Sequence, residues 1–180
     1  MKRKISEKVE IPQGVSCTYE NGILTCKKGS VEIKKEIKTS QAEIKIHGTH
    51  IAVECAKGNK NQYKIIMSIL AHIRNIFEGL DEKFVYELEA CNVHFPMSLK
   101  VEKDRITITN FLGEKNPRYA KVLPDVTVDI KGQKITVSSH YLEAAGQTAA
   151  NLEKATKIRG RDRRIFQDGI FITTKPERKI

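Results

Sequence analysis

The sequence lacks a long apolar run. Its first residues, MKRKISEKVEIP, carry charge throughout. A signal peptide needs an apolar stretch of about 7 to 15 residues, and a membrane-spanning helix needs about 20. The sequence therefore predicts an intracellular protein, located in the cytoplasm, with no membrane partner.

Cysteine is sparse and widely spaced. The four cysteines, Cys17, Cys26, Cys55 and Cys91, form no C-x-x-C pair and have no histidine cluster beside them. The spacing typical of zinc and redox sites is therefore missing. If Asn21-Gly22 is a two-residue turn, Cys17 lies opposite Cys26. A disulfide is geometrically conceivable there, but a shared apolar face and a reducing cytosol favour two buried thiols.

Recognisable catalytic and nucleotide-binding patterns are also absent. The glycines form neither G-x-G-x-x-G nor G-x-x-x-x-G-K-[ST] after a strand. His47 and His50 flank a turn at Gly48, but no third metal ligand of suitable type lies beside them. No serine or cysteine nucleophile arrangement surrounds the other histidines. We predict no enzymatic activity, no metal site and no cofactor.

Positive charge, by contrast, is abundant and unevenly distributed. The chain has 32 Lys and Arg residues against 22 Asp and Glu, a net charge of +10. Such an excess favours polyanionic partners over small neutral substrates. Residues 154–180 hold nine basic and three acidic residues, so most of the net charge lies there. One or two of these cations would suffice to offset a helix dipole, and the others indicate a charged partner.

An arginine-rich segment, KIRGRDRR, dominates this region. Four arginines lie within six residues: Arg159, Arg161, Arg163 and Arg164. The planar guanidinium suits bidentate contacts with phosphate and stacking on bases. Gly160 lets the backbone approach a phosphate closely. Because Asp162 would be unfavourable facing RNA, we expect it to fold back and orient a neighbouring arginine.

The segment that follows, IFQDGIFIT, predicts a hairpin. An Asp168-Gly169 turn would pair Gln167 with Ile170 and leave apolar residues on both faces. We expect this hairpin to be buried against the preceding helix. The arginines are then held at both ends, which lowers the entropy lost when they dock on a shaped target.

A second basic segment is NFLGEKNPRYAKVLP. It offers Lys115, Arg118 and Lys121 around Asn116-Pro117 and is predicted to be a loop between strands. An ordinary surface loop is the alternative interpretation.

One pattern occurs twice in the chain. Shifting the sequence against itself by 84 residues places Pro12 on Pro96 and Gly48 on Gly132 without a gap. AEIKIHGTHIAVEC and VTVDIKGQKITVSS alternate apolar with polar residues around these two glycines and predict hairpins. A helix follows each hairpin.

The first helix presents an apolar stripe made by Ile65, Ile66, Ile69, Leu70, Ile73 and Phe77. Gly79 is its expected C-terminal stop. The second helix has Ser138 or Ser139 as its expected N-cap. It packs inward through Leu142, Ala145, Ala149, Leu152 and Ala155. The sequence thus predicts an α+β fold of two duplicated domains, residues 8–81 and 83–175 with a basic tail 176–180, each a mainly antiparallel sheet packed with one helix.

Four segments resemble one known family. HFPMSLKV, NFLGEKNPRYAKVLPDVTV, GQTAANLEKAT and DRRIFQDGIF occur in this order and are similar to the large-subunit ribosomal protein six family, in its archaeal and eukaryotic branch. The resemblance implies an internally duplicated pair of α+β domains. It also implies binding to large-subunit rRNA, chiefly through the second domain, near the base of the factor-binding stalk and the sarcin-ricin region. Neighbouring ribosomal proteins and translation factors are the other implied partners.

The resemblance assigns the RNA-facing part to residues 146–151 and to the loop ahead of DRRIFQDGI. Together with the basic residues, this gives the predicted RNA-binding set: Gly146, Gln147, Asn151, Lys154, Lys157, Arg159, Arg161, Arg163, Arg164, Lys115, Arg118, Lys121, Lys175, Arg178 and Lys179.

The function expected from these features is that of a structural, non-catalytic constituent of the large ribosomal subunit that supports translation. A free-standing RNA-binding module or chaperone is one alternative. An enzyme acting on nucleic acid is the other, and it would need a metal site or a carboxylate pair near the basic loop.

Overall fold

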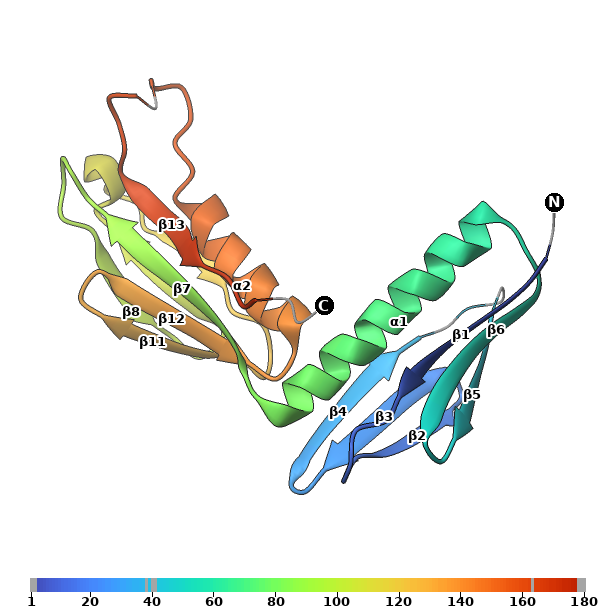
Figure 1. Ribbon diagram of the computed structural model, residues 1–180. Coiled ribbons are helices and arrows are strands. Elements are labelled where there is room, and N and C mark those ends of the chain that lie inside the picture. Colours follow the sequence, from blue (N-terminus) through green and yellow to red (C-terminus); the bar gives the residue numbers. More distant parts are fainter. Residues whose placement is uncertain (1–2, 38, 40–41, 163, 178–180) are drawn as a thin grey trace. The chain divides into compact units, whose positions relative to one another are not determined.

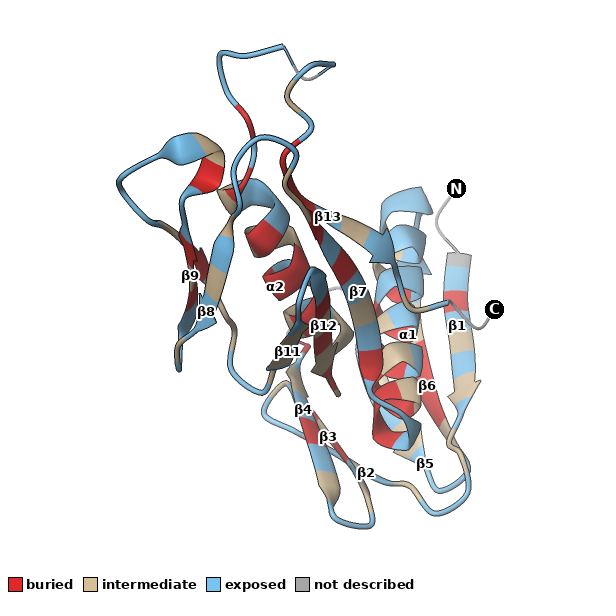
Figure 2. Cartoon of the chain, turned by 90° about the vertical axis from the view of Figure 1, so that its left-hand side faces the viewer, coloured by how far each residue is buried: buried red, intermediate tan, exposed pale blue. Residues whose placement is uncertain are grey.

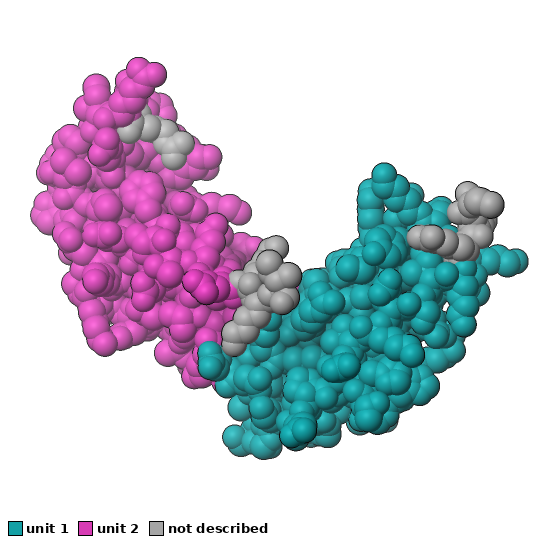
Figure 3. Space-filling view, in the orientation of Figure 1, with its two compact units in different colours: residues 1–82 teal, residues 83–180 magenta. Residues whose placement is uncertain are grey.

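The chain divides into two compact units, residues 1–82 and 83–180. Figure 3 colours them teal and magenta. The computed structural model describes residues 3–37, 39, 42–162 and 164–177. No helix within these ranges is both long and apolar enough to span a lipid bilayer.

The first unit consists of strands and one long helix (Figure 1). Its elements are β1 (Arg3–Glu10), β2 (Ser16–Glu20), β3 (Ile23–Lys28), β4 (Val31–Glu36), β5 (Glu43–His47), β6 (His50–Gly58) and α1 (Lys60–Asp81). Over the described residues the strands form two antiparallel sheets, β1-β6-β5 and β2-β3-β4. Helix α1 packs against strands of both.

Helix α1 has a capped N-terminus and ends later than predicted. Asn59 is its N-cap: its Oδ1 accepts hydrogen bonds from the amides of Asn61 (2.8 Å) and Gln62 (3.3 Å), and Gln62 Oε1 accepts from the amide of Asn59 (3.1 Å). The predicted apolar stripe is confirmed, since five of its six members are buried. The predicted stop at Gly79 is wrong, because this buried glycine lies inside the helix and the backbone becomes extended only at Glu82.

The second unit has two antiparallel sheets on either side of one helix. Its elements are β7 (Phe84–Cys91), β8 (Ser98–Val101), β9 (Arg105–Thr109), the 3-10 turn η1 (Phe111–Gly113), β10 (Arg118–Lys121), β11 (Thr127–Lys131), β12 (Lys134–Ser139), α2 (Leu142–Ala155) and β13 (Gly169–Thr174). Within the described residues the sheets are β10-β9-β8 and β11-β12-β7-β13. Helix α2 packs against β10 of the first and against β7, β12 and β13 of the second.

Small side chains let α2 fit between these sheets. Of the five residues predicted to pack inward, Ala145, Ala149 and the larger Leu152 are fully buried, and Leu142 and Ala155 are partly buried. Figure 2 shows the buried positions along α2 in red. Neither predicted serine is the N-cap, which is Tyr141. Ser139 lies two residues earlier; its hydroxyl accepts from the Tyr141 amide (3.1 Å) and donates to the carbonyl of Asp125 (2.8 Å). Ser139 therefore fixes the backbone just before α2 and does not cap the first turn of the helix.

The predicted fold class is confirmed: each unit is α+β, with antiparallel sheets packed against one helix. The predicted hairpin at Asp168-Gly169 is wrong. Strand β13 pairs with β7, with Ile170 opposite Ala90 and Phe171 opposite Glu89. The apolar residues of β13 therefore complete an existing sheet instead of pairing with residues 165–167.

Candidate nucleic-acid interface

Residues 157–168, here called the arginine loop, connect α2 to β13 and extend beyond both elements in Figure 1. Their described basic side chains, Lys157, Arg159, Arg161 and Arg164, are exposed. Gly160 has φ +68°, and nothing lies within 4 Å of the position that a Cβ would take. Such a left-handed backbone favours glycine. The loop therefore presents cations on a backbone with open space around its glycine.

The start of the loop is tied to β13. Thr156, almost fully buried, accepts a hydrogen bond through Oγ1 from the amide of Ile170 (2.9 Å) and donates to the carbonyl of Leu152 (3.3 Å). Ile158 is also buried. These contacts hold the point where the chain leaves α2 against the point where β13 begins.

The end of the loop is fixed by a buried carboxylate. Asp168, 2% exposed, accepts hydrogen bonds through Oδ1 from the amides of Val93 (2.7 Å) and His94 (3.0 Å). Its Oδ2 lies 2.6 Å from His94 Nδ1. Burial favours the neutral acid, but the contacts with His94 and Val93 outweigh it and lower the pKa of Asp168. Asp168 thus joins the arginine loop to the segment after β7. We call these contacts of Asp168 with Val93 and His94 the clamp.

An aromatic stack supports one arginine. The rings of His94 and Phe166 stack with their centroids 5.0 Å apart, and the Arg161 guanidinium lies 4.8 Å from the centroid of Phe166. A cation over an aromatic face is attracted by the ring quadrupole. Arg161 is therefore positioned by contacts that lead back to Asp168 through His94.

Asp162 shapes the backbone of the loop. Its Oδ1 accepts from the amide of Arg164 (2.9 Å), and its carbonyl accepts from the amides of Ile165 (3.2 Å) and Phe166 (3.0 Å). We predicted that Asp162 would orient an arginine side chain. In the described part of the loop it closes a turn instead, as aspartate commonly does.

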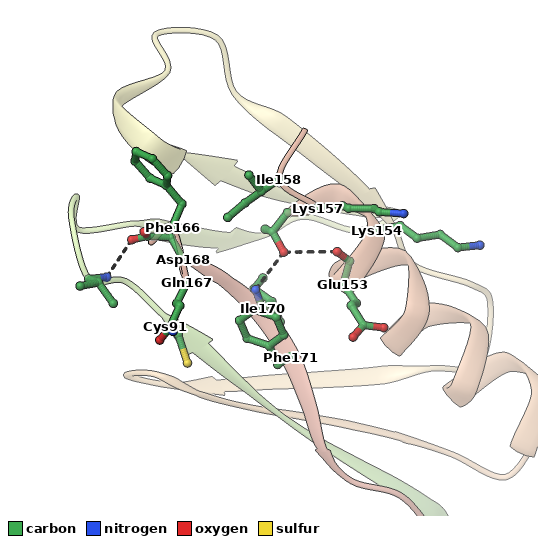
Figure 4. A pocket seen from close by; sticks show the side chains of 12 residues that line it. Cys91, Glu153, Lys154, Lys157, Ile158, Phe166, Gln167, Asp168, Ile170 and Phe171 are labelled. Atoms are coloured by element: carbon green, nitrogen blue, oxygen red, sulfur yellow. Dashed lines mark hydrogen bonds between the residues drawn. The ribbon is translucent and has the colours of Figure 1, made fainter. Parts of the chain in front are cut away.

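A pocket of about 770 Å³ opens between the arginine loop, the end of α2 and β13 (Figure 4). Lys154 and Lys157 line it from the α2 side, and in Figure 4 their side chains extend in the same direction. The other lining residues are Cys91, Val93, Glu153, Thr156, Ile158, Phe166, Gln167, Asp168, Ile170 and Phe171. Lys154 at the end of α2 and Lys157 at the start of the arginine loop therefore lie on the same pocket.

Arg118 has an internal role. The segment predicted as a loop contains β10, and Arg118 begins that strand. Its guanidinium pairs with Glu114 and donates to the carbonyl of Ala155 (2.9 Å) and, more weakly, to that of Lys157 (3.4 Å). It also lies 4.4 Å from the centroid of the Phe111 ring. Arg118 lowers the pKa of Glu114 and supports the base of the arginine loop.

The residues that the family resemblance assigned on α2 differ in their contacts. A Cβ on Gly146 would lie 2.9 Å from the hydroxyl oxygen of Tyr86, so this glycine allows close packing of helix and sheet. Asn151 accepts from Gln147 Nε2 (2.9 Å) and donates through Nδ2 to the carbonyl of Lys121 (2.9 Å). Gly146 and Asn151 therefore help to hold α2 in place, while the Gln147 side chain is exposed.

Three further lysines of the predicted set, Lys115, Lys121 and Lys175, are exposed. Arg163, Arg178 and Lys179 lie outside the described residues. Sequence reasoning did not identify His94, Phe166 or the clamp role of Asp168. No local sequence pattern indicates the contact between His94 and Asp168, because these residues are 74 positions apart in the chain.

No set of three or more His, Cys, Asp or Glu side chains in the described part of the chain is arranged to hold a metal ion. The rings of His47 and His50 stack across their turn, with centroids 4.9 Å apart.

Comparison with known proteins gives consistent matches. Residues 95–169 match the family model described as Ribosomal protein L6. The chain is 42% identical over 171 residues to "Large ribosomal subunit protein uL6" of Methanococcus vannielii, covering 95% of this chain and 94% of the relative. Proteins of the same name from Methanobrevibacter smithii (39% identity, 95% and 96% coverage) and Methanocella arvoryzae (38%, 93% and 95%) are also similar.

Proposed function

The chain belongs to the ribosomal protein L6 family, and we propose that it binds large-subunit rRNA through the arginine loop as a structural, non-catalytic component of the large ribosomal subunit. A protein of that subunit is located on cytoplasmic ribosomes, as the sequence predicted. The proposed position near the stalk base and the sarcin-ricin region, with ribosomal proteins and translation factors as neighbours, rests on the family resemblance.

The observation that supports RNA binding most strongly is a set of exposed cations on a loop fixed at both ends. Lys154, Lys157, Arg159, Arg161 and Arg164 lie on or beside that loop. Thr156 and Asp168 hold its two ends. A preordered loop loses less entropy on binding than a loose basic tail of equal charge.

The supporting residues divide into two groups. We propose that the exposed cations of the predicted RNA-binding set, including Lys115, Lys121 and Lys175, contact phosphates. The second group, Arg118, Gly146 and Asn151, is already engaged within the unit. We propose that this group maintains the shape of the surface.

The salt dependence of binding tests the arginine loop. Each phosphate contact contributes about 0.7 to 0.9 to the slope of log affinity against log salt. The triple change of Arg159, Arg161 and Arg164 to Ala should therefore reduce that slope by about 2 to 3. The assay is equilibrium binding to large-subunit rRNA over a salt series.

The matched control changes three exposed lysines in other parts of the same unit to Ala: Lys100, Lys131 and Lys134. It changes the net charge equally and should leave the slope near that of the wild-type protein. If both variants reduce the slope by the same amount, binding depends on overall charge and the assignment to the arginine loop is wrong.

A further inference from the structure

A hairpin in the first unit brings two cysteines together. Strands β2 and β3 are joined by Asn21 and Gly22, with φ +52° and +80°, as a two-residue type I′ turn requires. In the observed register Cys17 lies opposite Cys26, and their sulfur atoms are 2.9 Å apart. Neither cysteine is in a disulfide.

The position of this pair in the hairpin suits a disulfide. Cross-strand pairs alternate between hydrogen-bonded and closer, non-hydrogen-bonded positions, with Cα separations of about 5.5 and 4.5 Å. Counting outward from the closing pair Glu20 and Ile23 places Cys17 and Cys26 at a non-hydrogen-bonded position. The shorter separation lies within the range that a disulfide spans, about 4.4 to 6.8 Å. Starting from 2.9 Å, the sulfurs need to approach by only about 0.9 Å to bond.

The other two cysteines have different neighbours. Cys55 pairs across its sheet with Ile5, and Cys91 pairs with Gly169 in the second unit. They therefore serve as internal controls for any thiol chemistry at the hairpin.

We propose that Cys17 and Cys26 are an oxidisable dithiol, which forms an intramolecular disulfide by exchange with a small-molecule disulfide of the oxidised-glutathione class. This proposal concerns the first unit and does not depend on RNA binding by the second.

The two sulfurs have unequal roles in this exchange. Cys17 is partly exposed, whereas Cys26 is fully buried. The hydrogen bond between them lowers the pKa of Cys17, and the same contact together with burial raises the pKa of Cys26. Because the thiolate is the attacking species, Cys17 reacts first and Cys26 resolves the product.

The exchange balances in two steps. The Cys17 thiolate attacks one sulfur of the small disulfide, forms a mixed disulfide and releases one small thiolate. The Cys26 thiol then loses its proton, attacks the Cys17 sulfur and releases the second small thiolate. The two protein S–H protons end on the two small thiols. The protein pair is oxidised by two electrons, and the small disulfide is reduced by two.

The test treats the folded full-length protein with oxidised glutathione, quenches the reaction with acid, and maps the disulfide-linked peptides by mass spectrometry. The wild-type protein should lose two of its four thiols and yield a Cys17–Cys26 linked peptide. The C26S variant should accumulate one glutathionyl group on Cys17, whereas C17S should remain unmodified at Cys26. Circular dichroism verifies that each variant is folded, and C26A replaces any serine variant that is not.

Three outcomes contradict the proposal. If wild-type protein retains all four thiols, or if Cys55 or Cys91 reacts before the hairpin pair, the dithiol is not an oxidisable site. If C17S and C26S carry equal amounts of adduct, the proposed order of attack is wrong. The wild-type peptide map requires no substitution, so the first outcome is decisive even if every variant unfolds.

Discussion

Replacing Asp168 should weaken RNA binding without removing any cation that we propose to contact RNA. Hydrogen bonds to a charged group contribute about 1.5 to 3 kcal/mol each, and Asp168 accepts from two amides and lies beside His94 Nδ1. Because Val93 and His94 are exposed and water can partly replace the lost acceptor, the three contacts together contribute about 3 to 5 kcal/mol rather than their full sum. Asp168→Ala should lower the unfolding free energy of the second unit by that amount. Asp168→Asn keeps one accepting oxygen and should cost about 1 to 3 kcal/mol.

The expected loss of affinity follows from the entropy of the loop. Once the clamp is weakened, the residues next to it must be ordered again when RNA binds, at about 1 to 2 kcal/mol for each residue. Ordering one or two residues corresponds to roughly ten- to a hundredfold weaker binding. The slope of log affinity against log salt should not change, because every arginine remains.

The assay compares Asp168→Asn with Asp129→Asn over a salt series on large-subunit rRNA. Asp129 is exposed on β11 in the same unit, so this control changes the net charge equally without affecting the clamp. Hydrogen exchange at the Val93 and His94 amides should increase only in Asp168→Asn. If the two variants bind equally well, the clamp does not order the loop. If Asp168→Asn has a smaller salt slope, Asp168 determines which phosphates are contacted, and the entropic explanation is wrong.

Three further predictions concern the stability of the second unit. Arg118→Lys should lower the unfolding free energy of the unit by about 1 to 3 kcal/mol in urea titrations. The control is Arg105→Lys: the Arg105 guanidinium contacts a carboxylate and an aromatic ring at an exposed position, so this change should cost less than about 0.5 kcal/mol. Equal costs would contradict a structural role for Arg118. Gly146→Ala should destabilise the unit by about 1 kcal/mol, because crowding against the Tyr86 hydroxyl outweighs the gain in helix propensity. In a double-mutant cycle, Tyr86→Phe should remove most of that cost. If the effects of the two changes simply add, this explanation is wrong. Because the folded-state pKa of Asp168 is lowered, its stabilisation is complete above about pH 3.9 and is lost as the pH falls through the folded-state pKa. Acid titrations of Asp168→Asn should lack this component, and identical acid profiles would refute it.

Repetition and periodicity made the fold predictable. The alternation around Gly48 and Gly132 marks hairpins that the structure contains at β5–β6 and β11–β12. The apolar stripe of α1 and the small-residue face of α2 are likewise read from local spacing. The register of Cys17 and Cys26 followed from the Asn21-Gly22 turn alone.

The contacts that position the arginine loop were beyond local rules. Asp168-Gly169 has the sequence of a hairpin turn, but burial of β13 beside β7 competes with that local preference and prevails. Once β13 pairs with β7, the Asp168 carboxylate lies at the amides of Val93 and His94, a pairing across 75 and 74 residues. Arg118 is a similar case: the sequence gives its charge, but only the tertiary structure places the Ala155 carbonyl beside its guanidinium.

The most direct test of the account is sedimentation of the protein with large ribosomal subunits through a sucrose gradient at elevated salt. Wild-type protein should travel with the large subunit. The variant with Arg159, Arg161 and Arg164 changed to Ala should remain near the top of the gradient. The control variant lacking Lys100, Lys131 and Lys134 should travel with the large subunit. A wild-type protein that is absent from the particle would favour a free-standing RNA-binding module. An arginine-loop variant that sediments as well as the wild-type protein would contradict the proposal that this loop binds the subunit.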